Sequence, residues 1–176
     1  MCFHFKQTKT EDSFKSQGIK GTPLTGVYNG FVHPNVSCIT EARPYDISNL
    51  SWGLIPEWSK SEEIKKYTLN ARFETLNEKP SFKNAKRCVI FADGFYEWHT
   101  PDADDPDAKR GKNGKVLKQP YFIRPADHTS LPMAGLYELW RDPSRVGQAD
   151  EVLITCTILT TAATANFEAI HDRMPM

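Results

Sequence analysis

Runs of apolar residues separated by turn-forming residues dominate this sequence, and they predict β-strands. The runs are rich in β-branched and aromatic side chains, which favour strands over helices. They occupy residues 36–40, 87–98, 121–124, 133–140 and 151–159. We therefore expect a protein in which β-structure predominates.

Two shorter segments have helical patterns. Ser59 is followed three residues later by Glu62, which is the spacing of a capping box, and predicts a helix through Tyr67. A second helix is expected over residues 161–170, where Phe167 and Ile170 lie three residues apart on one face. A few short helices beside a dominant sheet indicate the α+β class.

Residues 101–118 contain almost no large apolar side chain and predict an exposed loop or hairpin tip inserted between strands. Four aspartates in this stretch suggest calcium at first sight. The pattern fails, however, because Pro106 occupies the fifth position of an EF-hand loop and the closing glutamate is missing. No metal site is expected here.

Length and composition predict one globular domain over residues 1–176, since 39% of the 176 residues are hydrophobic and can fill a core. The 22 basic and 22 acidic residues cancel, so any binding to nucleic acid must come from a local patch. No apolar run approaches the roughly 20 residues of a membrane helix, and the N-terminus lacks a secretory pattern. We expect a cytoplasmic protein.

The four cysteines are far apart and contain no CxxC pair, which argues against zinc and redox sites. Cys38, Cys88 and Cys156 lie within apolar runs, where a thiol usually behaves as a small buried hydrophobe. Cys2 is different because aminopeptidase can remove Met1 in front of so small a side chain. The new N-terminus would then expose a free α-amine and a thiol on adjacent carbons.

This pair of groups is suited to capture an aldehyde. The α-amine has a reference pKa of about 7.7–8.0 and the thiol about 8.5, so either becomes a nucleophile with a modest shift. The amine forms a Schiff base, and the thiolate then closes a five-membered thiazolidine ring. The alternative is that Cys2 is an accident of a flexible terminus.

Five motifs extend over nearly the whole chain and are specific as a set. They are MC at the start, WGLIPEW at 52–58, LNARFET at 69–75, CVIFADGFYEW at 88–98 and IHDRMP at 170–175. In this order and spacing they resemble the SOS-response-associated peptidase (SRAP) family. The resemblance implies a single domain built on a curved, barrel-like antiparallel sheet with a few short helices.

The resemblance also implies a function in the DNA damage response. Family members bind single-stranded DNA in a positively lined cleft and form thiazolidine crosslinks with the ring-opened sugar of abasic sites. They also remove their own initiating methionine or propeptide, which explains the peptidase name. Such a protein would associate with the nucleoid when bound to DNA.

The sequence has no glycine-rich phosphate loop or metal-ligand cluster, so no cofactor, nucleotide or metal is expected.

The resemblance assigns catalytic roles to four residues. Cys2 would be the nucleophile, and Asn70 would hold its amine or the sugar by hydrogen bonds. Glu97 would act as general acid and base, with an outward-facing strand residue as the alternative. His171 would be the second proton-transfer group, since histidine titrates in the range that this chemistry requires, with a helix-end cap as the alternative.

Five further residues are expected at the DNA surface. Arg72 resembles the family's phosphate-binding arginine, although a surface ion pair would also explain it. Pro34, Trp52 and Trp98 match family positions that pack against bases beside the lesion, while a core position remains the alternative for Trp52. His4 stands where most relatives have an arginine that touches DNA, because this chain begins MCFH where they begin MCGR.

The chain also stops at Met176, directly after HDRMP, where the family continues for several more segments. We therefore expect a shortened family domain.

Two other functions remain open on the sequence. One is a cysteine peptidase acting in trans, with Cys2 as nucleophile and His171 as base. The other is a module that binds single-stranded DNA reversibly, without covalent chemistry.

Overall fold

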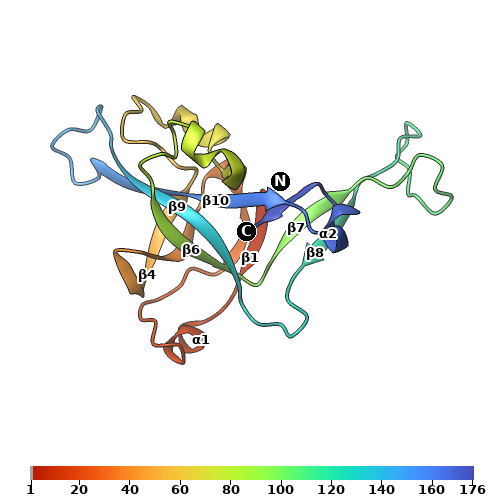
Figure 1. Cartoon of the computed structure of the whole chain (residues 1–176), viewed down its shortest axis with the longest axis horizontal. Coiled ribbons are helices and arrows are strands. Elements are labelled where there is room, and N and C mark those ends of the chain that lie inside the picture. The colour runs from red at the N-terminus through yellow and green to blue at the C-terminus, as the bar shows by residue number, and fades with distance from the viewer. Residues whose placement is uncertain (1) are drawn as a thin grey trace.

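Across residues 2–176, which the computed structural model describes, the chain forms two β-sheets of four and seven strands (Figure 1). The four-stranded sheet has the order β2-β1-β7-β8. Its strands are β1 (His4–Gln7), β2 (Gly26–Asn29), β7 (Gly94–His99) and β8 (Gln119–Ile123). The other sheet contains β3 (Asn35–Thr40), β4 (Arg43–Trp52), β5 (Asn70–Arg72), β6 (Lys86–Ala92), β9 (Leu131–Arg141), β10 (Val152–Ala162) and β11 (Arg173–Pro175).

The larger sheet closes on itself as a barrel. Its order is β10-β4-β3-β6-β9, and β9 pairs again with β10 from Val152↔Arg141 to Ile158↔Gly135. Closure pairs the backbone groups that an open sheet would leave at its edges. The α+β barrel expected from the sequence is confirmed, with one addition: β10 runs parallel to β4 and β5, so the sheet is mixed.

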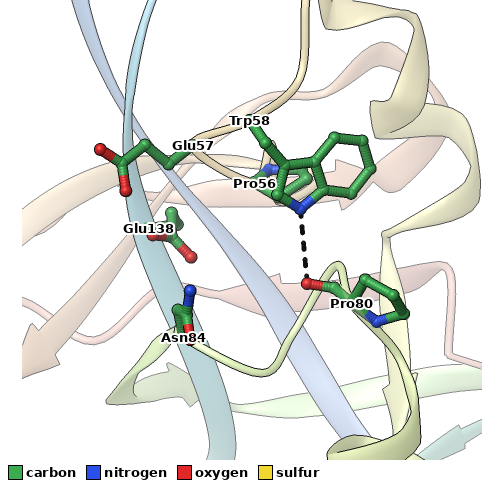
Figure 2. A pocket seen from close by; sticks show the side chains of 6 residues that line it. All are labelled: Pro56, Glu57, Trp58, Pro80, Asn84 and Glu138. Carbon is green, nitrogen blue, oxygen red and sulfur yellow. Dashed lines mark hydrogen bonds between the residues drawn. The ribbon is translucent and has the colours of Figure 1, made fainter.

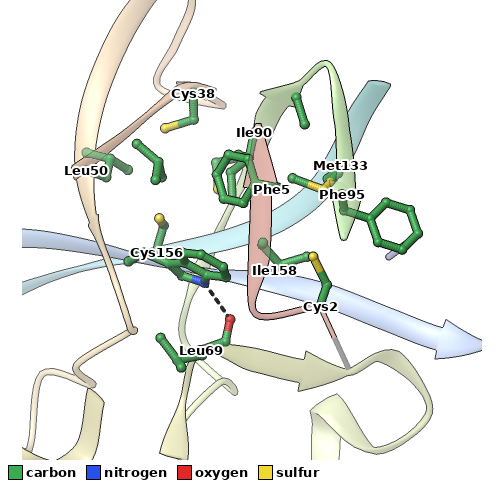
Figure 3. Close-up of a cluster of buried hydrophobic side chains, with 14 of the residues drawn as sticks. Cys2, Phe5, Cys38, Leu50, Leu69, Ile90, Phe95, Met133, Cys156 and Ile158 are labelled. Carbon is green, nitrogen blue, oxygen red and sulfur yellow. Dashed lines mark hydrogen bonds between the residues drawn. The ribbon is translucent and has the colours of Figure 1, made fainter. Parts of the chain in front are cut away.

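The interior of the barrel is filled by a cluster of buried side chains (Figure 3). Cys38, Cys88 and Cys156 are among them, as their apolar surroundings in the sequence predict. Strand β10 contributes a continuous buried run, from Thr155 to Thr160, because its middle is covered on both faces. This explains why β10 reads as an unbroken apolar strand in the sequence.

The predicted strand over residues 87–98 is wrong in one respect, because it is two strands that belong to different sheets. β6 ends at Ala92, the chain bends at Asp93, and β7 begins at Gly94. A Cβ atom on Gly94 would lie 2.3 Å from the Ile123 carbonyl oxygen, so no other residue fits without movement. Asp93–Gly94 is therefore the junction between the sheets.

A buried glutamine joins the sheets at a second point. Gln7, in β1, donates from Nε2 to the carbonyl oxygens of Ser37 and Phe91, and its Oε1 accepts from the Ser37 N–H at 3.1 Å. Because the amide is buried with each of its polar atoms paired, these bonds tie β1 to the barrel strands β3 and β6.

Helical structure is short throughout residues 2–176. The elements are α1 (Glu11–Lys15), α2 (Ala165–Glu168) and the 3-10 segments η1 (Gly30–Val32), η2 (Glu62–Tyr67) and η3 (Phe73–Glu78). The first predicted helix appears as η2, but its capping box does not form, since Ser59 donates to the Ser61 carbonyl instead. The second prediction, over 161–170, is largely wrong because β10 continues through Ala162.

In the described residues, no helix has both the length and the apolar character to cross a membrane.

Residues 101–118 form an arm that projects from the end of the four-stranded sheet (Figure 1). Most of these residues are exposed, and a bridge between Arg110 and Val116 closes the tip. The arm connects β7 to β8, so its base is fixed by the pairing of His99 with Gln119.

Candidate active site

Cys2 lies two residues before β1, and its side chain is fully buried. It belongs to the same core cluster as Ile158 and Phe95, and Figure 3 shows it on the side of that cluster away from Cys38. Burial, with the nearby Glu97 carboxylate as the second cause, raises the pKa of the Cys2 thiol to about 12. The thiol is therefore protonated at neutral pH.

The sequence predicts that removal of Met1 makes Cys2 the N-terminal residue. In the chain that begins with Met1, the pairing of β1 with β2 and β7 carries the Cys2 side chain into the core. The predicted cleavage of Met1 concerns a residue outside the described part of the chain.

Asn70 holds the backbone of Cys2. It begins β5, which pairs in parallel with β10 through Ile158↔Asn70. Its Nδ2 donates to the Cys2 carbonyl oxygen at 3.0 Å. Its Oδ1 is buried and has no hydrogen-bond partner among the described residues, which leaves a strong acceptor beside the backbone of Cys2.

Glu97 projects inward from β7. The residue is 6% exposed, so the alternative of an outward-facing strand position does not apply. Its Oε1 accepts a hydrogen bond from the Trp98 N–H at 3.3 Å. Its charge is also the second cause, after burial, of the raised pKa of the Cys2 thiol.

A cleft of about 380 Å³ opens beside Glu97. It is lined by Phe3, His4, Glu97, Trp98, Lys118 and His171. The rings of His4 and Trp98 meet edge to face with centroids 4.9 Å apart. Burial lowers the pKa of His4, against the smaller opposing effect of Glu97, so this imidazole is neutral at neutral pH.

His171 follows α2 and precedes β11. Its Nδ1 lies 2.6 Å from Asp172 Oδ1 and 3.0 Å from the Arg173 backbone nitrogen. These two contacts are alternatives, because a protonated Nδ1 donates to the carboxylate whereas an unprotonated Nδ1 accepts from the amide. His171 therefore has a partner in either protonation state, as a proton-transfer group requires.

An ion pair fixes the segment that carries His171. The Arg173 guanidinium donates to both oxygens of Glu74, at 2.9 and 3.3 Å, and to the Thr160 carbonyl oxygen at 2.7 Å. Glu74 also accepts from the Ala162 N–H. The contact joins the LNARFET and IHDRMP motifs across the end of β10, with the bidentate geometry that favours arginine.

Comparison with known proteins decides the family. The model of the SOS response associated peptidase (SRAP) family matches residues 1–176. The chain belongs to the SRAP family.

Three similar proteins support this assignment of an SRAP chain. One is "Abasic site processing protein YoqW" of Bacillus subtilis (strain 168), 42% identical over 133 residues, covering 74% of this chain and 52% of that protein. Another is "Abasic site processing protein HMCES" of Gallus gallus, 34% identical, covering 73% of this chain and 41% of that one. The chain thus spans about half the length of the curated relatives it matches. A crystal structure from Bacteroides thetaiotaomicron has a TM-score of 0.79 and 30% identity, covering 99% of this chain and 75% of that one.

The residues expected at the DNA surface of this SRAP chain are in different surroundings. Arg72 is exposed in β5, and Pro34, Trp98 and His4 are partly exposed. Trp52 is fully buried, and its Nε1 donates to the Leu69 carbonyl oxygen at 2.8 Å within the core. The core alternative therefore holds for Trp52, whose ring has no exposed face for a base.

The WGLIPEW motif contributes instead to a second groove. Figure 2 shows Trp58 above Pro80, with Glu57, Glu138 and Asn84 beside it. Burial, with Glu57 as the second cause, raises the pKa of Glu138. The groove shares no lining residue with the cleft beside Glu97. Two neighbouring carboxylates make it an unfavourable surface for a phosphate backbone.

Sequence reasoning missed three residues of the site. Phe3 and Lys118 line the cleft, and Glu74 fixes the segment of His171. Because Glu74 lies within the LNARFET motif, its place in the motif could have identified it as a residue of the site. Within residues 2–176 no cluster of three or more side chains that could hold a metal ion is found.

Proposed function

We propose that this SRAP chain processes abasic sites in single-stranded DNA by forming a thiazolidine crosslink through Cys2. The observation that carries the proposal is the hydrogen bond from Asn70 to the Cys2 carbonyl, together with the electrostatic effect of Glu97 on the Cys2 thiol. Membership of the SRAP family and the similarity to proteins named for abasic site processing support the choice of substrate.

The first step is removal of Met1, by the protein itself or by an aminopeptidase, which creates the α-amine of Cys2. Near neutral pH this amine is a competent nucleophile, because the reference pKa of an α-amine is about 7.7–8.0. The amine attacks the sugar aldehyde, and loss of one water molecule gives an imine. In this proposal the Cys2 carbonyl oxygen keeps its hydrogen bond from the Asn70 amide during both the attack and the loss of water.

Ring closure follows without any oxidant or cofactor. The Cys2 sulfur attacks the imine carbon, a new S–C bond forms, and the thiol proton ends on the imine nitrogen. In this proposal Glu97, whose charge acts on the thiol, takes the thiol proton and returns it to the imine nitrogen. His171, in the same cleft, serves the proton transfers of sugar ring opening.

The DNA strand reaches the cleft across partly exposed and exposed residues. Arg72 offers a planar guanidinium to a phosphate, and Trp98 and Pro34 offer apolar surface to the bases beside the lesion. His4 replaces an arginine and is neutral, so its contribution is a hydrogen bond rather than a charge. The protein would act in the DNA damage (SOS) response and associate with the nucleoid when bound.

The test is a denaturing gel of Met1-free protein, verified by mass, with single-stranded DNA that carries one abasic site. A shifted band that requires the lesion supports the proposal. Absence of the band would refute it. Cleavage of an added peptide by the same preparation would then favour the peptidase function, and reversible retention of DNA would favour a binding module.

A further inference from the structure

Lys118 is the residue directly before β8, where the arm joins the four-stranded sheet. Two residues further along, Pro120 pairs with Trp98 on β7. Lys118 lines the cleft together with His4 and His171.

The charge of Lys118 is available in that cleft. Among the described residues that line the cleft, it is the one lysine or arginine. The imidazole of His4 is neutral because burial lowers its pKa, and His171 lies against the Asp172 carboxylate. No ion pair within residues 2–176 involves Lys118. Its ammonium group therefore forms no ion pair with another described side chain, although Glu97 lines the same cleft.

We infer that Lys118 binds a backbone phosphate of the DNA strand next to the abasic sugar. The inference rests on the proposed function and adds the residue that positions the strand in the cleft. A sugar that approaches the buried Glu97 carboxylate brings a phosphate on each side, and like charges repel unless a cation faces them. A lysine on a flexible stem binds a phosphate as a point charge without demanding one orientation. Lys118 thus supplies the charge that His4 lacks.

The arm provides a matched control for this role. Lys112 is exposed at the tip of the same arm and is not part of the cleft lining. Lys112→Gln removes the same charge from the same segment as Lys118→Gln, but at a distance from the cleft. Lys118→Arg keeps the charge in place.

The experiment measures the affinity for single-stranded DNA that carries a tetrahydrofuran abasic analogue, which has no aldehyde and cannot crosslink. Affinity is followed over about 50 to 200 mM salt, where each phosphate contact contributes about 0.7 to the slope of log affinity against log salt. We expect Lys118→Gln to lower the magnitude of the slope by about 0.7. The ratio of wild-type affinity to Lys118→Gln affinity should then fall about threefold as salt rises from about 50 to 200 mM. Lys118→Arg and Lys112→Gln should keep the wild-type slope.

Two results would overturn the inference while leaving the proposed function intact. One is a wild-type slope in Lys118→Gln, and the other is an equal loss of slope in Lys112→Gln, which would indicate a general charge effect. Covalent crosslinking by the wild-type protein, measured in parallel with true abasic DNA, shows whether the function itself holds. If the wild-type protein neither binds nor crosslinks DNA, both proposals fail.

Discussion

Cys2 and the three barrel cysteines are all buried, yet their surroundings differ. Cys38, Cys88 and Cys156 lie among apolar strand residues and affect one another. The pKa of Cys88 is raised mainly by a hydrogen bond to Cys38 and then by burial, and that of Cys156 mainly by burial. Cys2 instead has the amide of Asn70 on its carbonyl and the carboxylate of Glu97 near its sulfur.

Burial and a raised thiol pKa therefore do not separate Cys2 from Cys88 and Cys156. What distinguishes Cys2 is the Asn70 amide on its carbonyl, the effect of the Glu97 charge on its thiol and the α-amine that removal of Met1 would create. The following changes test this distinction.

The largest effect is expected for Cys2→Ala, which removes the sulfur needed for ring closure. We expect no denaturant-resistant species with abasic DNA on a denaturing gel. Cys38→Ala is the matched control. It should still crosslink, while losing about 1 kcal/mol of unfolding free energy for the core atoms removed. Crosslinking by Cys2→Ala at the wild-type yield would contradict the proposed role.

Glu97→Gln should reduce the rate of crosslink formation by about 100-fold or more, because a general acid and base contributes about 10²- to 10⁴-fold. Glutamine keeps the volume of the side chain, so packing is preserved. The measurement is a time course by gel at fixed pH. Glu138→Gln, in the second groove, serves as the control and should react within about twofold of wild type. Equal rates for Glu97→Gln and wild type would remove Glu97 from the mechanism.

Asn70→Ala should slow crosslinking by about tenfold. The hydrogen bond to the Cys2 carbonyl, at 3.0 Å, is worth about 1–1.5 kcal/mol in positioning, and 1.4 kcal/mol corresponds to a factor of about ten. The same time course measures the effect. Asn84→Ala, which changes an exposed amide of the second groove, should react normally. A comparable loss in that control would indicate that amide removal acts through stability instead.

The smallest effect is expected at the ion pair that supports His171. The Arg173 guanidinium lowers the pKa of Glu74 from 4.5 to about 2. Because the pKa is depressed in the folded state, this pair stabilises the protein above pH 4.5, and the stabilisation is lost as pH falls toward 2. Denaturant unfolding between these pH values should show a weaker pH dependence in Glu74→Gln than in wild type.

Glu63→Gln is the control for this measurement, since Glu63 is exposed on η2 and has no ion pair among the described residues. It should keep the wild-type pH dependence. The same dependence in Glu74→Gln would mean that the ion pair does not contribute to stability.

The sequence predicts much of the barrel because its strands are marked by β-branched and aromatic runs. It does not predict β4, because the first half of this strand, RPYDIS, is mostly polar and has no run of apolar residues; in the structure its first residues are exposed. The break at Asp93 was signalled by the Asp-Gly pair, but the apolar residues on both sides favoured one strand. The helix expected over 161–170 failed since the pairing of β10 with β11 extends the strand to Ala162.

The site was predicted in part for a similar reason. Motifs identify Cys2, Asn70, Glu97 and His171, and the structure brings them together. Lys118 and Phe3 depend on the register between strands that are distant in sequence, which no local pattern encodes. Trp52 shows the converse, because an aromatic residue in a motif gives no indication of which side of the sheet it faces.

The junction at Asp93–Gly94 has a mechanical consequence. Glu97 lies on β7 of the four-stranded sheet and Cys2 precedes its strand β1, whereas Asn70 begins β5 of the barrel sheet and His171 precedes β11. The residues proposed to act on the abasic site thus come from both sheets, which Gln7 links by hydrogen bonds and which share one core cluster. A change in the angle between the sheets would separate these residues while each sheet stays intact, so heating should abolish the proposed crosslinking before it unfolds the sheets.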